Sequence, residues 1–381
     1  MPRPIRIALA PGSHRGFASS LQCAEAMERG LRSTVRPANI LRVPLADGGD
    51  GTLEVLKGLI PCTVYRVPVH DPIGRLIDAR YLLSQDGSTC FLEMAEASGL
   101  RRMLPRERDA WHSSTYGTGE LIRYALDQGA PRIVLGIGGS ATLDCGAGAL
   151  SALGVRFLDL DGKLLHPSPS GLCSCARVDL TGIDNRLSER ELVLLSDVAT
   201  PLARSCALYG RQKGIPAADD ERYTKVIARM AREVAKRGVN ILDEPWLGAG
   251  GGLAGGLVGF LHATAKNGAE TIGQFASLEE KLRIADVVVT GEGRLDASSF
   301  DGKVPVFVAR LATLHAIPCV ILVHEVEAGV EARLPEGASV FSTVHGDDET
   351  TMCSSSVLAE IENLASRVGM HVTTILGLRP I

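Results

Sequence analysis

Both ends of the chain alternate strand-like and helix-like segments, and this alternation restricts the fold more than any other feature. The strand-like segments are short apolar runs at residues 5–10, 39–45, 285–290, 318–323 and, more weakly, 338–344. Apolar residues at helical spacing follow at residues 21–31 and 304–315. Such alternation favours a parallel sheet with right-handed crossovers, in which the ligand-binding loops follow the carboxyl ends of the strands.

The middle of the chain differs, because three strand-like runs follow one another with only turn signals between them. They cover residues 63–69, 76–83 and 89–94, where we expect antiparallel pairing. We therefore expect an α/β protein of two domains with a cleft between them. Residues 1–64 and 286–381 are expected to form a discontinuous Rossmann-like parallel-sheet domain, and residues 65–285 an inserted mixed α/β domain.

Composition narrows the class of function. The 381 residues include 40 Lys and Arg against 44 Asp and Glu, a net charge of −4, whereas a nucleic-acid scaffold would have a basic excess. No run approaches the roughly 20 apolar residues of a membrane helix. Nine cysteines cannot all pair, and the first apolar run is too short for a signal peptide. We expect a cytoplasmic protein without nucleic-acid or membrane partners.

Glycine is unusually frequent, with 42 residues gathered in clusters, which indicates loops that approach a ligand closely. One cluster follows the strand-like run 132–135 and fits the pattern G-x-G-x-x-A from Gly136 to Ala141. This pattern is typical of the dinucleotide site of a nicotinamide-dependent oxidoreductase, of an anion site, or of a structural turn. Another cluster, residues 248–256, suits either an anion at a helix start or close helix packing.

Polar groups around the first cluster suit phosphate. The backbone amides of Gly138 and Gly139 and the hydroxyls of Ser140 and Thr142 are candidate phosphate ligands. Asp144 is placed either to hold Mg²⁺, which prefers a few carboxylates plus substrate oxygens, or to cap the helix expected from residue 147.

Three further segments, residues 47–51, 196–201 and 291–296, place carboxylates directly after strand-like runs. Any one of these acids can be a turn residue. Several carboxylates from neighbouring strand ends are also what general-base or metal-assisted chemistry needs. Arg294 and Lys303 supply cations that suit a substrate carboxylate or a developing phosphoryl charge.

Many longer motifs occur in a fixed order along the chain. They include Ala10 to Gly16 against A-P-D-S-F-K-G, Ala46 to Thr52 against A-D-G-G-E-G-T, Glu93 to Leu100 against E-M-A-x-A-S-G-L, Tyr116 to Ile122 against Y-G-T-G-E-L-I, Gly136 to Gly148 against G-I-G-G-S-A-T-N-D-G-G-A-G, Asp197 to Leu202 against D-V-x-N-P-L, Gln212-Lys213-Gly214 against Q-K-G, and Thr290 to Lys303 against T-G-E-G-R-x-D-x-Q-T-x-x-G-K. On these motifs the chain resembles the type I glycerate kinases of bacteria, as a diverged member.

The resemblance implies ATP-dependent phosphorylation of D-glycerate to phosphoglycerate, generally at the 2-hydroxyl, with Mg²⁺. It implies that a small hydroxy acid is the partner, and it does not decide whether the protein forms a homodimer. The residues expected to be catalytic are Asp47, Asp197, Glu292 and Asp296, without assignment of the general base among them. Those expected to bind substrate or phosphate are Ser13, Arg15, Gly48, Gly49, Asp50, Gly138, Gly139, Ser140, Thr142, Arg294 and Lys303. Asp144 and Asp197 are expected to hold the metal.

Several positions inside these motifs depart from the family pattern. Gly12 replaces an acid, Arg15 a lysine, Leu143 and Thr200 asparagines, Cys145 a glycine and Ser298 a glutamine, and His324-Glu325 stands where a small, glycine-containing turn is usual. A leucine makes no side-chain hydrogen bonds, and arginine is a planar fork rather than a point charge. An alternative is therefore a non-catalytic or substrate-shifted relative that binds another small hydroxy acid.

Overall fold

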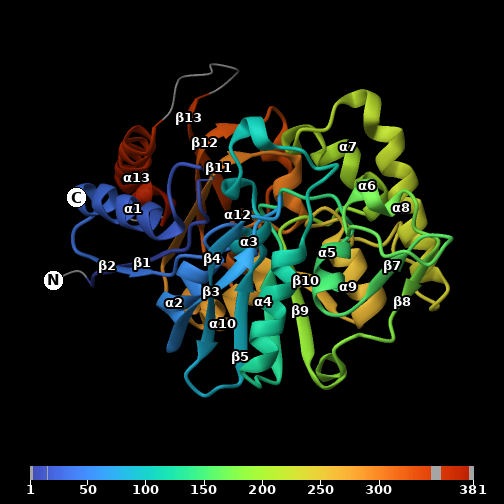
Figure 1. The fold of residues 1–381 in the computed structure, drawn as a ribbon. Helices are drawn as coiled ribbons and strands as arrows, with labels where there is room; N and C mark the ends of the chain where they lie inside the picture. The colour runs from blue at the N-terminus through green and yellow to red at the C-terminus, as the bar shows by residue number, and fades with distance from the viewer. Residues whose placement is uncertain (1–2, 15, 345–352, 377–381) are drawn as a thin grey trace. The chain divides into compact units, whose positions relative to one another are not determined.

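The computed structural model describes residues 3–14, 16–344 and 353–376 (Figure 1). It confirms the predicted α/β class. By their internal contacts, the residues divide into two compact units. The terminal unit comprises residues 1–47, 54–59 and 268–381, and the central unit residues 48–53 and 60–267. The domain boundaries predicted at residues 64/65 and 285/286, and the cleft, stay predictions.

The terminal unit is built on a five-stranded parallel sheet of order β13-β12-β11-β1-β2. Its strands are β1 (Ile5–Leu9), β2 (Ala38–Arg42), β11 (Val287–Leu295), β12 (Cys319–Val326) and β13 (Ala338–Val344). Each of the five strand-like segments expected at the two ends of the chain thus forms a strand. The N-terminal and C-terminal segments pair directly, since Ile7 lies opposite Val287.

Helix α1 (Ser20–Thr34) begins at a capping box, because Ser19 accepts a hydrogen bond from the backbone of Gln22 and the Gln22 side chain accepts one in return. It lies beside α13 (Ser354–Ile375), with Arg29 bonded to Glu362 at 2.8 Å (Figure 1). The expectations from sequence include no helix at residues 354–375. The other helices of this unit are α2 (Thr52–Leu59, in the unit from residue 54), α10 (Gly268–Phe275), α11 (Leu278–Arg283) and α12 (Val304–Leu314).

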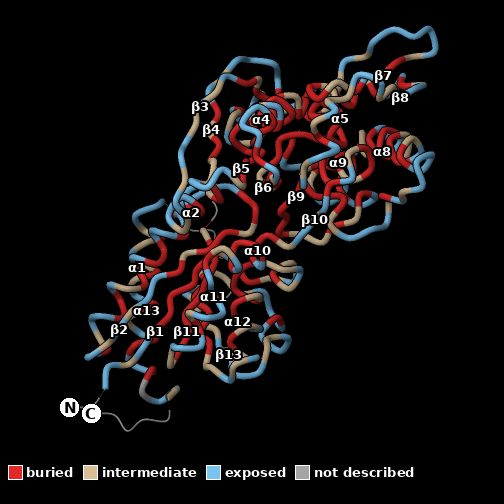
Figure 2. The backbone as a smooth tube through the Cα atoms, turned by 90° about the horizontal axis from the view of Figure 1, so that it is seen from below, coloured by how far each residue is buried: buried red, intermediate tan, exposed pale blue. Residues whose placement is uncertain are grey.

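The central unit contains a six-stranded mixed sheet of order β10-β9-β6-β5-β4-β3. Its strands are β3 (Cys62–His70), β4 (Leu76–Ser84), β5 (Thr89–Glu93), β6 (Arg132–Gly136), β9 (Glu191–Ser196) and β10 (Thr264–Asn267). The predicted antiparallel pairing of β3 with β4 and of β4 with β5 is confirmed, and the other pairs are parallel. Buried residues are concentrated on β5, β6 and β9 (Figure 2).

Several α-helices and one small strand pair also belong to the central unit. They are α3 (Met94–Ser98), α4 (Tyr116–Asp127), α5 (Ala147–Ala152), α6 (Pro169–Leu172), α7 (Ser205–Tyr209), α8 (Asp220–Ala235) and α9 (Leu253–Leu261), with β7 (Arg156–Leu158) antiparallel to β8 (Arg177–Asp179). Within the described ranges, none of the helices is both long and apolar enough to cross a membrane.

Candidate active site

The end of β11 differs from its prediction. The sequence predicts a strand that stops at Gly291, whereas β11 continues through Glu292 and Gly293 to Leu295. A Cβ atom on Gly291 would lie 2.2 Å from the carbonyl oxygen of Leu322, so glycine here permits close packing of paired strands and does not end the strand. Glu292 is therefore held by a strand rather than by a loop.

Glu292 is 9% exposed, and the Ser299 hydroxyl donates a hydrogen bond of 2.6 Å to its Oε1. Burial raises the pKa of Glu292 to about 7; Asp47 and Asp296 add to the rise, while Lys303 and Ser299 oppose it. These predicted site residues of the terminal unit are thus close enough to influence one another. A carboxyl group that titrates near neutral pH suits general-base chemistry.

The two predicted cations of this unit, Arg294 and Lys303, lie near acids. The Lys303 Nζ is 3.6 Å from Oδ1 of Asp296, and Arg294 lies 4.0 Å from Asp296 and 3.4 Å from Glu325. Burial would raise the pKa of Asp296, but hydrogen bonds from Ser298 and the charge of Lys303 hold it below its ordinary value.

The first loop of the terminal unit holds a buried histidine, His14, which is 3% exposed. Its Nδ1 lies 3.3 Å from the Sγ of Cys23, a residue of α1. Burial, with a smaller contribution from His324, lowers the pKa of His14 to about 4. The neighbouring Ser13 is half-buried, and the predicted Arg15 lies outside the described residues.

In the central unit, the structure brings Gly48, Gly49 and Asp50 next to Gly138 and Gly139. The Gly138 amide donates to the Gly48 carbonyl at 2.9 Å, and a Cβ on Gly139 would lie 2.8 Å from Oδ2 of Asp50. The predicted glycines of two separate motifs are therefore neighbours. The Gly138 amide is used within the protein, so a phosphate at this turn would be bound by other groups.

Glu93 and Arg101 hold the first of these segments. The Glu93 carboxylate accepts hydrogen bonds from the backbone amides of Gly51 and Leu53, and Arg101 lies 3.2 Å from Glu93 and 3.5 Å from Asp50. Burial raises the pKa of Glu93 to about 7, and Arg101 opposes the rise. The two family motifs that begin at residues 46 and 93 are thus parts of one structure.

Ser140 and Thr142 are buried, and their hydroxyls contact each other at 3.2 Å. The Ser140 hydroxyl also accepts from the Thr142 amide and lies 3.2 Å from the Gly250 carbonyl. These bonds shape the turn. Helix α5 begins only at Ala147, so the G-x-G-x-x-A segment does not open a helix as a dinucleotide fingerprint does.

The glycine cluster at residues 248–256 packs against this turn. A Cβ on Gly251 would lie 1.8 Å from the Thr142 carbonyl oxygen, and Gly251 has a φ of +70°. The Gly251 carbonyl accepts from the Cys145 amide at 3.2 Å. Of the two alternatives for this cluster, these contacts favour close packing.

Comparison with known proteins decides the family. The family model described as the glycerate kinase family matches residues 7–373. The chain belongs to the glycerate kinase family. It is 36% identical to a glycerate kinase of Halalkalibacterium halodurans (89% of this chain, 90% of the relative) and 36% identical to the glycerate 2-kinase of Escherichia coli (93% and 91%). A crystal structure of a protein assigned as glycerate kinase 2 from Salmonella typhimurium superposes with a TM-score of 0.80 at 36% identity, covering 99% of this chain and 100% of the other.

Membership of a kinase family implies a nucleotide substrate. Mg²⁺ is an expectation from the sequence, with Asp144 and Asp197 as its predicted ligands. Asp144 is completely buried and accepts four hydrogen bonds, from the amide and hydroxyl of Thr115 and from the amides of Gly146 and Gly148. Burial raises the pKa of Asp144, and these bonds oppose the rise. Three of these bonds reach Oδ2 and one reaches Oδ1, at a side chain with no exposed surface, so Asp144 fits the alternative role, fixing the start of α5, better than that of a metal ligand.

Asp197 is different, because it follows β9 directly and keeps the predicted place at a strand end with 5% exposure. Mg²⁺ in phosphoryl-transfer sites commonly uses one or two carboxylates plus phosphate oxygens, so a single aspartate fits. Within the part of the chain that the structure describes, no three His, Cys, Asp or Glu side chains are grouped to hold a metal by themselves.

The departures from the glycerate kinase pattern have local partners. Leu143 and Cys145 are buried in the hydrophobic core of the central unit, and Cys145 has a φ of +50° where the pattern has glycine. Thr200 contacts the Tyr209 hydroxyl at 2.7 Å, and Ser298 donates to Asp296 at 2.5 Å. Each of these four residues therefore takes part in a packing contact or a hydrogen bond within this chain.

Lys213, a buried cation of the central unit, is not among the site residues predicted from the sequence. Its Nζ donates to the Thr142 carbonyl at 2.7 Å and to the Ser140 hydroxyl at 3.3 Å. Burial lowers the pKa of Lys213 to about 7, and Asp144 opposes the shift. The Q-K-G motif marks the residue, but only the fold reveals that it is buried beside the turn.

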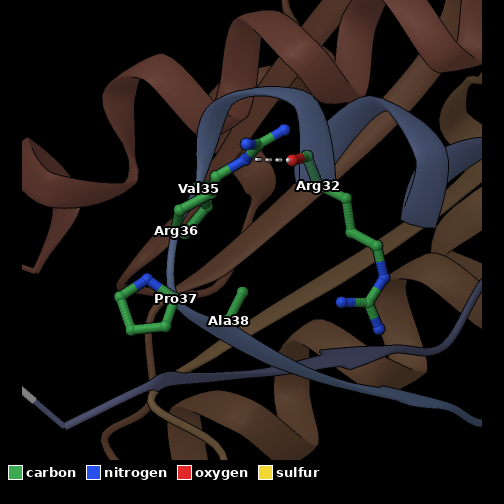
Figure 3. A pocket seen from close by; sticks show the side chains of 5 residues that line it. All are labelled: Arg32, Val35, Arg36, Pro37 and Ala38. Atoms are coloured by element: carbon green, nitrogen blue, oxygen red, sulfur yellow. Dashed lines mark hydrogen bonds between the residues drawn. The ribbon is translucent and has the colours of Figure 1, made fainter.

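A hollow of about 670 Å³ lies in the terminal unit where α1 leads into β2 (Figure 3). It is lined by Arg32, Val35, Arg36, Pro37 and Ala38. The Arg36 Nε points to the carbonyl oxygen of Arg32, at 3.4 Å. The hollow contains none of the predicted site residues, and we assign it no part in catalysis.

Proposed function

We propose that this member of the glycerate kinase family transfers the γ-phosphoryl group of ATP to the 2-hydroxyl group of D-glycerate, giving ADP and 2-phosphoglycerate. The Escherichia coli relative named glycerate 2-kinase supports the product. The observation that carries the proposal is Glu292, a buried carboxyl group with a pKa of about 7 inside the parallel strand β11, close to Asp47, Asp296 and Lys303.

In the proposed reaction, the Glu292 carboxylate takes the proton of the glycerate hydroxyl group. The hydroxyl oxygen forms a bond to the γ-phosphorus while the bond from phosphorus to the leaving ADP oxygen breaks. Phosphoryl transfer depends mainly on positioning and charge neutralisation. Lys303 and Arg294 provide positive charge for the phosphoryl group and the substrate carboxylate, and Asp47 and Asp296 keep these cations and Glu292 in place.

The turn that follows β6 binds phosphate of the nucleotide. The amides of Gly139 and Ser140 are the proposed donors, since the amides of Gly138, Ala141 and Thr142 are bonded to Gly48, Ser98 and the Ser140 hydroxyl. Asp197 would hold Mg²⁺, which neutralises negative charge on the phosphates when bound. We also propose that the protein is cytoplasmic and has no nucleic-acid or membrane partner. A measurement of the oligomeric state will decide whether it forms a homodimer.

The test is a coupled ADP-release assay with ATP, Mg²⁺ and D-glycerate, with L-glycerate, tartronate and glycolate as controls. Phosphorus NMR of the product identifies the phosphorylated hydroxyl. Turnover of D-glycerate with a 2-phosphate product supports the proposal. Turnover of a control acid instead would establish a substrate-shifted enzyme, and ADP binding without any turnover would establish a non-catalytic relative.

A further inference from the structure

Three segments far apart in the sequence meet at the side-chain nitrogen of Lys213 in the central unit. The Nζ donates to the Thr142 carbonyl at 2.7 Å and to the Ser140 hydroxyl at 3.3 Å. A Cβ on Gly251 would lie 3.0 Å from this nitrogen. Lys213, the turn after β6 and the glycine cluster therefore form one packed cluster.

Further hydrogen bonds connect the groups around the lysine. The Ser140 hydroxyl, which accepts from Lys213, lies 3.2 Å from the Gly250 carbonyl, and Gly251 accepts from the Cys145 amide. Lys213 is 3% exposed, so its nitrogen is held away from solvent among these groups. The absence of a side chain on Gly251 leaves space for the nitrogen.

Burial of an ammonium group is unfavourable, and it must be offset by interactions with the protein. Here the offsetting interactions are two hydrogen bonds to the turn and the electrostatic effects of Asp144 and Cys206. Both hydrogen bonds are made to Ser140 and Thr142. The geometry therefore assigns the lysine to the shape of this turn.

We propose that Lys213 is a positioning residue, which holds Ser140 and Thr142 so that the turn 139–142 keeps the shape that receives a phosphate group of the nucleotide. The inference rests on the proposed function, because it needs a nucleotide phosphate at this turn. It assigns Lys213 no contact with substrate. Its loss should therefore weaken binding of the phosphates and leave binding of the nucleoside part unchanged.

The test compares Lys213→Met with Lys225→Met, whose lysine is an exposed residue of α8 with 72% side-chain exposure. Affinities for ADP and for adenosine are measured by calorimetry, together with the melting temperature. We expect Lys213→Met to bind ADP at least about tenfold more weakly, with adenosine affinity within about twofold of the unsubstituted protein. The control should match the unsubstituted protein for both ligands.

Steady-state kinetics give a second readout that general loosening of the fold would not move selectively. We expect the KM for ATP to rise about tenfold in Lys213→Met and the KM for D-glycerate to stay within about twofold. An unchanged ratio of ADP to adenosine affinity, or an equal loss of both, would overturn the inference while leaving the proposed function intact.

Lys213→Gln, which keeps a polar head, serves if the methionine variant does not fold. If neither variant folds, Lys213 is a stability residue and the positioning role is wrong. If the unsubstituted protein binds no ADP and shows no turnover, the proposed function fails first, and the inference falls with it.

Discussion

The hydroxyl of Ser299 donates a hydrogen bond to the Oε1 of Glu292 across 2.6 Å. It orients a carboxyl group that is buried within strand β11. We expect Glu292→Gln to lower kcat by roughly 10²-fold or more, because general-base catalysis contributes about 10²–10⁴-fold. The coupled ADP-release assay measures the loss. An unchanged kcat in a folded variant would remove Glu292 from the reaction.

The same substitution should not lower the melting temperature. The raised pKa of Glu292 means that the folded protein keeps a proton that the unfolded chain releases, so the free energy of unfolding falls as the pH rises from about 4.5 through about 7. Glutamine carries no titratable proton, so the variant does not show this fall in the free energy of unfolding.

Ser299→Ala should shift the pH profile. The Ser299 hydrogen bond favours the charged form of Glu292 and lowers its pKa against the effect of burial. Without it, the acid limb of kcat/KM should move to higher pH, with the alkaline limb and the melting temperature little changed. A profile between pH 5 and 9 measures the shift. A shift to lower pH would contradict the assignment.

His14→Phe should make the terminal unit less sensitive to acid. Burial lowers the pKa of His14 from 6.5 to about 4, so the unfolded chain takes up a proton before the folded protein does. Stability from this group is present above pH 6.5 and is lost as the pH falls toward 4, by about 3 kcal/mol at 1.36 kcal/mol per pKa unit. Urea unfolding at pH 7 and pH 4.5 measures it.

His112→Asn is the control, since this histidine has 64% side-chain exposure. It should leave the difference between the two pH values unchanged. An equally large difference in the phenylalanine variant would show that other groups cause the acid sensitivity.

Gly48 and Gly51 form a matched pair within one loop, both with a φ of +91°. A Cβ on Gly48 would lie 2.4 Å from the Leu195 carbonyl oxygen, whereas a Cβ on Gly51 would meet nothing within 4 Å. Alanine at either position carries the same backbone strain, about 1 kcal/mol. We expect Gly48→Ala to lose roughly 2 kcal/mol more than Gly51→Ala in denaturant unfolding. Equal losses would contradict the close approach to Leu195.

Glu325→Gln should strengthen the binding of an anionic substrate. Glu325 lies 3.4 Å from Arg294, and their positions pair in the register of β11 with β12. Removing a charge beside a half-exposed arginine should lower the KM for D-glycerate about threefold at low salt, with little effect on stability. The gain should disappear at about 0.5 M salt, because the charges are screened. Glu331→Gln, an exposed acid of the same unit, should show no such gain.

The strands were accessible from sequence because apolar runs and turn residues are local signals. The runs at residues 63–69 and 76–83 are joined by a turn in which Asp71 accepts from the amides of Ile73 and Arg75. When turn-forming residues lie between two strand-like runs, the sequence itself indicates that these two strands pair. The predicted antiparallel pairing is accordingly confirmed in detail.

The features that the sequence alone does not reveal depend on residues distant in sequence. The strand expected to end at Gly291 continues, because Leu322 approaches where a side chain would be. Asp144 was open between metal and cap, and Thr115, 29 positions earlier, supplies two of its four hydrogen bonds. Lys213 belongs to the Q-K-G motif, but its burial depends on contacts with Thr142, 71 positions earlier in the chain.

The pairing of β1 with β11 has a consequence for synthesis of the protein. Ile7 and its partner Val287 are 280 positions apart, so on the ribosome β1 waits roughly 14–56 s for β11 at about 5–20 residues per second. The apolar side chains of Ile7 and Leu9, buried in the finished protein, remain without their final cover during that time. Most of the central unit is complete before β11 emerges, and nascent chains should therefore acquire protease resistance in the middle of the sequence first and at the amino terminus last.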